Sequence, residues 1–83
     1  MSYIDKILEM MRKNPAARIL FVTHSFAPGL EPFEFEAGEV WVTGDGYDPL
    51  RAFELDLLLK AGLVEKERES RETIYYRLSE SAK

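Results

Sequence analysis

The sequence predicts a single α+β domain, residues 1–83, with about three helices, a small antiparallel sheet and a C-terminal β-hairpin. Three observations indicate this fold class. Apolar residues recur at helical spacing over residues 49–61, and Gly62 follows where helices often end. Two runs of strand-forming residues, 63–68 and 73–78, come next. The chain has 83 residues, 46% of them hydrophobic, so it is long enough for one small packed domain.

An amphipathic first helix is expected between Ser2 and Asn14. Ser2 is the candidate N-cap, and Asp5 lies three residues later, where the acid of a capping box belongs. The apolar residues of one face include Ile7 and Met11, at helical spacing. The helix should end before Pro15, because the residue that precedes a proline avoids the helical conformation.

Residues 16–26 allow two readings. Residues 19–23 are rich in β-branched and aromatic types, which favours a strand, but a second helix running to Phe26 remains an alternative. His24 and Ser25 are the only residues here that suggest catalysis. Nucleophilic chemistry also needs a third group that orients the base, and the sequence supplies none. We therefore expect no enzyme, no cofactor and no metal site.

The middle of the chain predicts a second hairpin and then the main helix. Residues 33–36 alternate apolar and acidic side chains, a turn follows, and residues 40–42 resume a strand pattern. Trp41 is expected either in the core under the helices or at an interface. The glycine-rich residues 43–47 should form a tight turn, with Asp48 as N-cap and Pro49 as first residue of the helix.

The net charge of −4 is unevenly distributed. Residues 1–30 carry four basic and two acidic side chains, residues 31–48 carry six acidic and no basic ones, and residues 49–83 carry seven of each. The acidic segment, residues 31–48, is interpreted as a solvated face or as a docking surface for a basic protein partner. A strongly polyanion-binding protein is not expected, although a locally basic face remains compatible with this distribution.

Composition also gives expectations about location. There is no cysteine, which excludes disulfides, and no apolar run approaches the roughly 20 residues that a membrane span needs. No signal-peptide pattern is present, so a cytoplasmic protein without membrane contact is expected. The absence of glutamine, the single asparagine and the 31% of charged residues lean toward a thermophile.

The second half of the chain resembles the C-terminal half of a winged-helix domain. The resemblance depends on Leu-Leu-Leu-Lys-Ala-Gly-Leu-Val at 57–64, on the charged hairpin, and on Tyr-Arg-Leu-Ser-Glu at 76–80. It is similar to the small archaeal and bacterial regulators of that superfamily. The resemblance implies a recognition helix at 49–61 and a wing within 63–78. The segment before the helix departs from the usual helix-turn-helix.

The resemblance implies double-stranded DNA as a partner, bound modestly and in a salt-sensitive way by a small dimeric transcriptional regulator. Lys66 and Arg68, taken to share one face of their strand, and Arg71 at the wing tip would contact phosphates. Tyr47 and Arg51 would lie near the groove. The alternative is a winged-helix-shaped protein-interaction module that does not bind DNA. DNA binding predicts a continuous positive patch across wing and helix start, whereas the alternative predicts an exposed apolar patch around Trp41 or the leucines.

Overall fold

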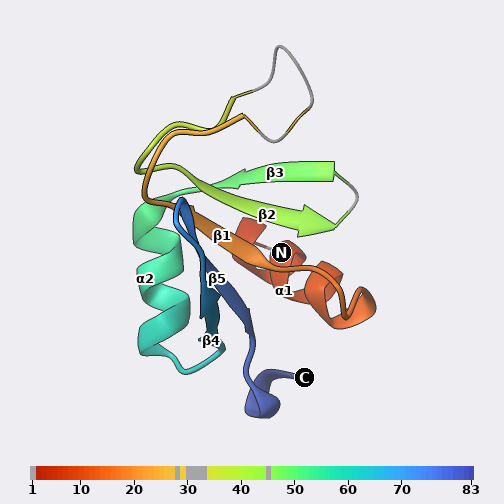
Figure 1. Ribbon diagram of the computed structural model, residues 1–83. Coiled ribbons are helices and arrows are strands. Elements are labelled where there is room, and N and C mark those ends of the chain that lie inside the picture. Colours follow the sequence, from red (N-terminus) through yellow and green to blue (C-terminus); the bar gives the residue numbers. More distant parts are fainter. Residues whose placement is uncertain (1, 28, 30–33, 45) are drawn as a thin grey trace.

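The computed structural model describes residues 2–27, 29, 34–44 and 46–83. Their five strands form one antiparallel sheet in the order β3-β2-β1-β5-β4 (Figure 1). The elements in chain order are α1 (Tyr3–Lys13), β1 (Ile19–Val22), β2 (Val40–Gly44), β3 (Gly46–Leu50), α2 (Ala52–Lys60), β4 (Val64–Glu69), β5 (Thr73–Leu78) and a short 3₁₀ helix, η1 (Glu80–Ala82).

The prediction of about three helices with a small sheet and a C-terminal wing is wrong. The described residues contain two α-helices and a five-stranded sheet. Strands β4 and β5 do form a hairpin, but β5 also pairs with β1 along residues 19–22, so the hairpin is part of the main sheet. The cause lies in β1. Its apolar, β-branched residues form the central strand, which pairs with β2 on one side and β5 on the other.

The expected start of the main helix is also wrong. Residues 46–50 form strand β3, which returns along β2 after Gly46, whose φ of 101° suits glycine. Pro49 pairs with Trp41 and is tolerated because β3 is an edge strand, where no ladder N–H is needed on the outer side. Helix α2 therefore begins at Ala52. Its N-cap is Arg51 in place of Asp48, and the Glu54 carboxylate accepts a hydrogen bond from the Arg51 backbone N–H at 3.0 Å.

The hairpin expected between residues 33–36 and 40–42 does not form in the part of it that the structure describes. Val40 and Val42 pair with β1 and with β3 instead. Phe33 lies outside the described residues. Phe35 forms a single antiparallel bridge with Phe26, and its side chain is buried. The segment before β2 therefore folds over the sheet and does not extend it.

The predictions for the first helix are confirmed. The Ser2 hydroxyl accepts from the Asp5 backbone N–H, the Asp5 carboxylate accepts in return from Ser2, and Asn14 is the C-cap. Of the two readings for residues 16–26, the structure has the strand. Neither helix of the described chain combines the length and apolar character needed to cross a membrane.

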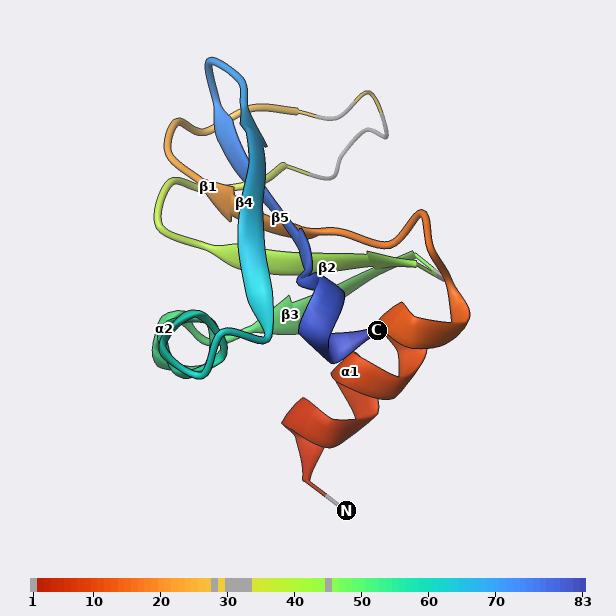
Figure 2. The same ribbon diagram turned by 90° about the horizontal axis from the view of Figure 1, so that it is seen from below.

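The two faces of the sheet differ in what covers them. Both helices pack on the same face, as the view from below shows (Figure 2). Ile19 and Val42 point to this face and belong to the main core. The core comprises Ile7, Leu8, Met11, Ala17, Ile19, Val40, Val42, Leu50, Leu55, Leu58, Val64, Leu78 and Ala82. The opposite face, called the helix-free face below, carries the cross-strand neighbours Leu20, Trp41 and Tyr75.

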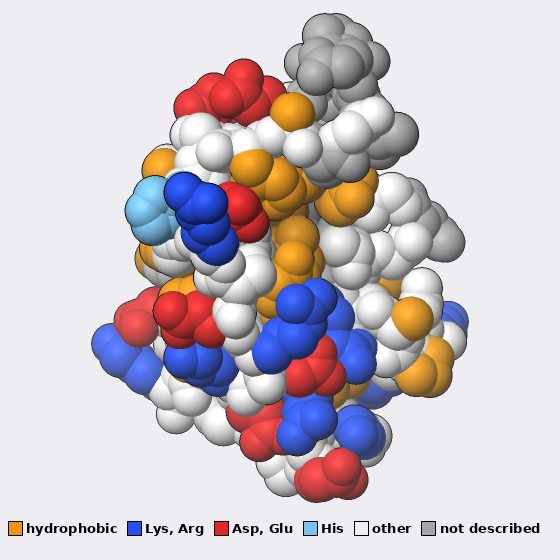
Figure 3. Space-filling model, viewed as in Figure 1, with side chains coloured by type: hydrophobic (Ala, Val, Ile, Leu, Met, Phe, Trp, Pro, Cys, Tyr) orange, Lys and Arg blue, Asp and Glu red, His pale blue; other side chains and the backbone are white. Residues whose placement is uncertain are grey.

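Trp41 therefore does not lie under the helices. It is partly buried on the helix-free face, where its ring lies 5.4 Å from the ring of Phe35. Phe35 in turn packs on Phe26, at 5.2 Å between ring centroids. Aromatic side chains from residues 26 and 35 thus cover part of the helix-free face, and hydrophobic side chains run down the middle of that face (Figure 3).

Candidate interaction surface

The structure does not bring the five predicted DNA-binding residues together. Tyr47 lies on β3 and Arg51 directly follows it, whereas Lys66 and Arg68 lie on β4. Strands β3 and β4 are the opposite edges of the sheet. Four strand spacings of about 4.8 Å separate them, which is roughly 19 Å measured along the sheet. The positive patch predicted across the hairpin and the helix start is therefore not continuous. Tyr47 and Arg51 lie near one edge of the sheet, and Lys66 and Arg68 lie at the other.

Tyr47 and Arg51 both lie against aromatic rings. The Tyr47 ring meets Phe35 edge-on at 5.0 Å, and the Arg51 guanidinium lies 5.9 Å from the centroid of the Phe53 ring. Near this place the Tyr3 hydroxyl donates a 2.6 Å hydrogen bond to the Pro49 carbonyl, which ties α1 to β3. Burial is the main cause that raises the pKa of Tyr3.

The three hairpin cations differ in their surroundings. A β-bulge between Lys66 and Arg68 places them opposite Tyr76 and Tyr75, so the two side chains lie on opposite faces of the sheet and not on one face. The Lys66 ammonium pairs with Glu69 at 2.7 Å, and this hydrogen bond raises the pKa of Lys66. The Arg68 guanidinium stacks 3.7 Å from the Tyr75 ring centroid. Arg71 is exposed in the β4–β5 turn.

Helix α2 carries apolar side chains on both of its sides. Leu55 and Leu58 are buried in the core. On the other side, Phe53 and Leu57 are four residues apart and are 57% and 52% exposed. The Asp56–Lys60 ion pair, with 2.8 Å between its atoms, lies beside them, and the hydrogen bond to Asp56 raises the pKa of Lys60.

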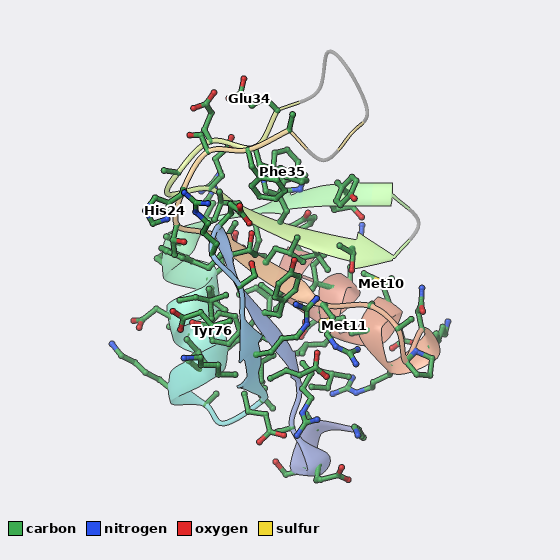
Figure 4. The ribbon with its side chains drawn as sticks, in the orientation of Figure 1. Met10, Met11, His24, Glu34, Phe35 and Tyr76 are labelled. Carbon is green, nitrogen blue, oxygen red and sulfur yellow. The ribbon has the colours of Figure 1, made fainter. Side chains whose placement is uncertain are left out.

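A shallow apolar groove continues this exposed side of α2 toward the sheet. It has a volume of about 200 Å³ and is bounded by α2 on one side and by β1 and β5 on the other. Tyr76 lies between β5 and α2 (Figure 4). The lining residues are Phe21, Ala52, Leu55, Asp56, Leu59, Ile74 and Tyr76. We call Phe53, Leu57, Leu59 and this groove the α2 surface.

The sequence signal for the α2 surface is the run of leucines at residues 57–59, because the protein-interaction alternative predicts an exposed apolar patch around Trp41 or the leucines. The sequence alone does not reveal which of these leucines face the core and which face outward. That division follows from the start of the helix at Ala52 and from its place on the sheet. Leu57 and Leu58 are neighbours in sequence, yet one is half exposed and the other is buried.

His24 and Ser25 do not form a nucleophile–base pair. His24 is exposed, and its Nδ1 atom lies 3.3 Å from the Thr23 hydroxyl. The Ser25 hydroxyl donates to the Glu36 carboxylate at 3.1 Å. Across the described ranges, no group of three or more His, Cys, Asp or Glu side chains is placed to hold a metal ion. Of the acidic segment, Glu34, Glu36 and Asp48 are exposed, while Glu31 and Asp45 lie outside the described residues.

Comparison of the chain with protein-family models, with curated proteins and with solved structures found no match in any of the three. The comparisons therefore identify no winged-helix superfamily. What the chain can do has to be argued from its own surfaces. Among the described residues, the α2 surface carries the exposed side chains of Phe53, Leu57 and Leu59.

Proposed function

We propose that this protein is a protein-interaction module that dimerises through the α2 surface. The observation that carries the proposal is the exposure of Phe53 and Leu57 on the side of α2 opposite the core. A helix that packs on one side normally carries a single apolar stripe, whereas α2 has apolar side chains on its outer side as well. Contiguous exposed apolar surface of this kind marks an interaction site.

The gain from covering this surface is large for so small a chain. A twofold pairing removes Phe53 and Leu57 of both copies from water. Each side chain is only about half exposed in the monomer, so each contributes about half of the roughly 1.5–3 kcal/mol that full burial gives. Association also costs several kcal/mol in lost translational and rotational freedom, so only the surplus appears as affinity. The test below uses micromolar concentrations, because a dissociation constant of about 1 μM corresponds to a net free energy of about −8 kcal/mol.

The residues of α2 favour a second copy as the partner. If two α2 helices pack antiparallel about a twofold axis at Leu57, Phe53 of one copy lies level with the small Ala61 of the other. A surface that matches itself in this way suits the isologous interface of a C2 dimer.

Sedimentation equilibrium tests this proposal. At about 100 μM, wild-type protein should have twice the 9.6 kDa mass of the chain, and dilution to below about 1 μM should give monomer. The F53S/L57S double variant should stay monomeric with an unchanged circular dichroism spectrum. The matched control, K6S/E9S, changes two exposed residues of α1 and should dimerise like wild type. A monomeric wild-type protein at 100 μM would remove the second copy as the partner.

A second candidate function is modest binding of double-stranded DNA through the β4–β5 hairpin. The observation that favours it is that Arg68 and Arg71 form no ion pair within the described part of the chain, which leaves both available to phosphates. About two phosphate contacts would give a slope near −2 in log affinity against log salt concentration.

A gel-shift titration of duplex DNA at low salt tests this second candidate. The Arg68/Arg71 double alanine variant should lose most of the affinity, whereas F53S/L57S, which leaves the hairpin unchanged, should bind DNA like the wild-type monomer. Equal affinity of the wild type and the Arg68/Arg71 variant would remove these two residues as the DNA site.

A further inference from the structure

A second pocket lies away from the α2 surface, where α1 ends, β1 begins and β5 leaves the sheet. Its volume is about 280 Å³. Four of its lining side chains are cationic and none is acidic. The lining residues are Arg12, Pro15, Ala17, Arg18, Arg77, Leu78 and Lys83. These residues come from both ends of the sequence, so the pocket exists only in the folded chain.

Backbone carbonyls and carboxylates hold the three guanidinium groups in place. The Arg12 Nε donates to the Ala82 carbonyl at 2.9 Å. The Arg18 Nε donates to Glu67 at 2.8 Å, and its Nη1 donates to two backbone carbonyls. The Arg77 Nε donates to Glu65 at 3.1 Å. The Nη2 atoms of these three arginines make no hydrogen bond to the described residues, so fixed donors remain for a ligand.

The four cations of the pocket differ in whether a carboxylate side chain pairs with them. Arg18 and Arg77 pair with Glu67 and Glu65, and Lys83 pairs with Glu80. Arg12 forms no ion pair with any described carboxylate and is held only by a neutral carbonyl. An anion with several oxygens would satisfy donors from more than one arginine at once.

We infer that this pocket binds the phosphate group of a small phosphomonoester. The terminal nitrogens of Arg12, Arg18 and Arg77 donate to its oxygens, and Pro15 and Leu78 contact its organic part. A phosphate dianion presents three terminal oxygens, which suits three guanidinium groups better than the two oxygens of a carboxylate. The volume of about 280 Å³ lies just below the roughly 300–1,000 Å³ of ligand pockets, which suits a compact metabolite.

Titration of ¹⁵N-labelled protein with adenosine 5′-monophosphate tests the inference, with adenosine and inorganic phosphate as separate arms. The Nε–H signals of Arg12, Arg18 and Arg77 should shift and saturate with a dissociation constant below about 1 mM. Inorganic phosphate should shift the same signals more weakly, and adenosine should not shift them. Absence of saturation up to about 10 mM of the monophosphate would overturn the inference.

Two kinds of variant distinguish specific binding in the pocket from nonspecific electrostatic attraction of the anion to the protein. Arg12→Gln should weaken binding at least about tenfold, because it removes the cation without a carboxylate partner. Lys13→Gln removes one positive charge at the same helix end outside the pocket lining and should change affinity less than about twofold. If Arg12→Gln proves unfolded, Lys83→Gln replaces it, with an expected loss of about threefold. Equal losses from the pocket variant and Lys13→Gln would overturn the site. Tighter binding of a single-stranded oligonucleotide than of the monophosphate would overturn the small-molecule assignment.

Discussion

The two helices pack on the same face of the sheet but present different outer sides. Helix α1 buries Ile7, Leu8 and Met11, and its exposed residues include the charged Asp5, Lys6, Glu9 and Lys13. Helix α2 buries Leu55 and Leu58 and exposes Phe53 and Leu57. Helix α1 needs no further partner, because the sheet covers its apolar side and its polar side faces water. Helix α2 has a second apolar side that the described chain leaves open.

This difference indicates that the outer residues of α2 are not needed to hold the helix on the sheet. Leu58, which is 1% exposed, provides the packing, whereas Leu57 is exposed beside it. Stability and association should therefore be separable by substitution at adjacent positions. The predictions below test that separation, beginning with the largest expected effect.

The largest effect is expected at Leu58. Replacing it with alanine removes a buried side chain and leaves a cavity, which should lower the free energy of unfolding by about 2–4 kcal/mol. Leu57→Ala, measured at a concentration where the protein is monomeric, should cost less than about 1 kcal/mol. Urea titration followed by circular dichroism measures both. Similar losses at the two positions would show that the outer side of α2 also supports the monomer fold.

Substitutions at the N-caps should change the stability by an intermediate amount, lowering it in α1 and raising it in α2. The Ser2 hydroxyl caps α1, so Ser2→Ala should destabilise the protein by about 1 kcal/mol. The N-cap of α2 is Arg51, whose side chain offers no acceptor to the first turn. Arg51→Ser should therefore stabilise the protein by up to about 1 kcal/mol. Thermal unfolding measures both variants, and destabilisation by Arg51→Ser would show that stacking on Phe53 outweighs the missing cap.

The smallest effect concerns the charged pair beside the outer apolar residues of α2. The hydrogen bond from Lys60 to Asp56 raises the pKa of Lys60 above its ordinary value of 10.5. A raised folded-state pKa gives a stabilisation that is fully present below pH 10.5 and is lost as the pH rises through the folded pKa. Proton titration of the Lys60 side chain by NMR should show the raised value, and Asp56→Asn should return it to the ordinary one. An unchanged titration in Asp56→Asn would assign the shift to another cause.

Local sequence signals predicted α1 correctly but gave the wrong structure for residues 46–50, which form β3. The difference is whether distant residues decide the conformation. The capping box, the apolar spacing and the Asn-Pro stop all lie within residues 2–15, so the sequence alone places α1. Asp48 and Pro49 look equally like a helix start, but pairing with β2 over residues 40–44 takes precedence. An edge strand accepts the proline, and that position in the sheet is set by residues far away in the sequence.

The candidate site was predictable only in part for a similar reason. The apolar character of α2 is visible in the sequence and suggested an interface. The five predicted DNA contacts lie close together along the chain, but the strand order places Tyr47 on one edge strand and Lys66 on the other. The β-bulge between Lys66 and Arg68 puts their side chains on opposite faces of the sheet, and the sequence pattern of residues 64–69 does not reveal this bulge.

A single introduced cysteine tests the central claim most directly, because the natural sequence contains none. In the proposed antiparallel pairing, residue 57 lies at the twofold axis, close enough to its copy for a disulfide once the helices are 8–10 Å apart, roughly the usual packing distance. Leu57→Cys should form a cross-linked dimer rapidly under mild oxidation, while Glu9→Cys on the outer side of α1 should not. Equal slow cross-linking of both variants would contradict the α2 surface as the contact between copies.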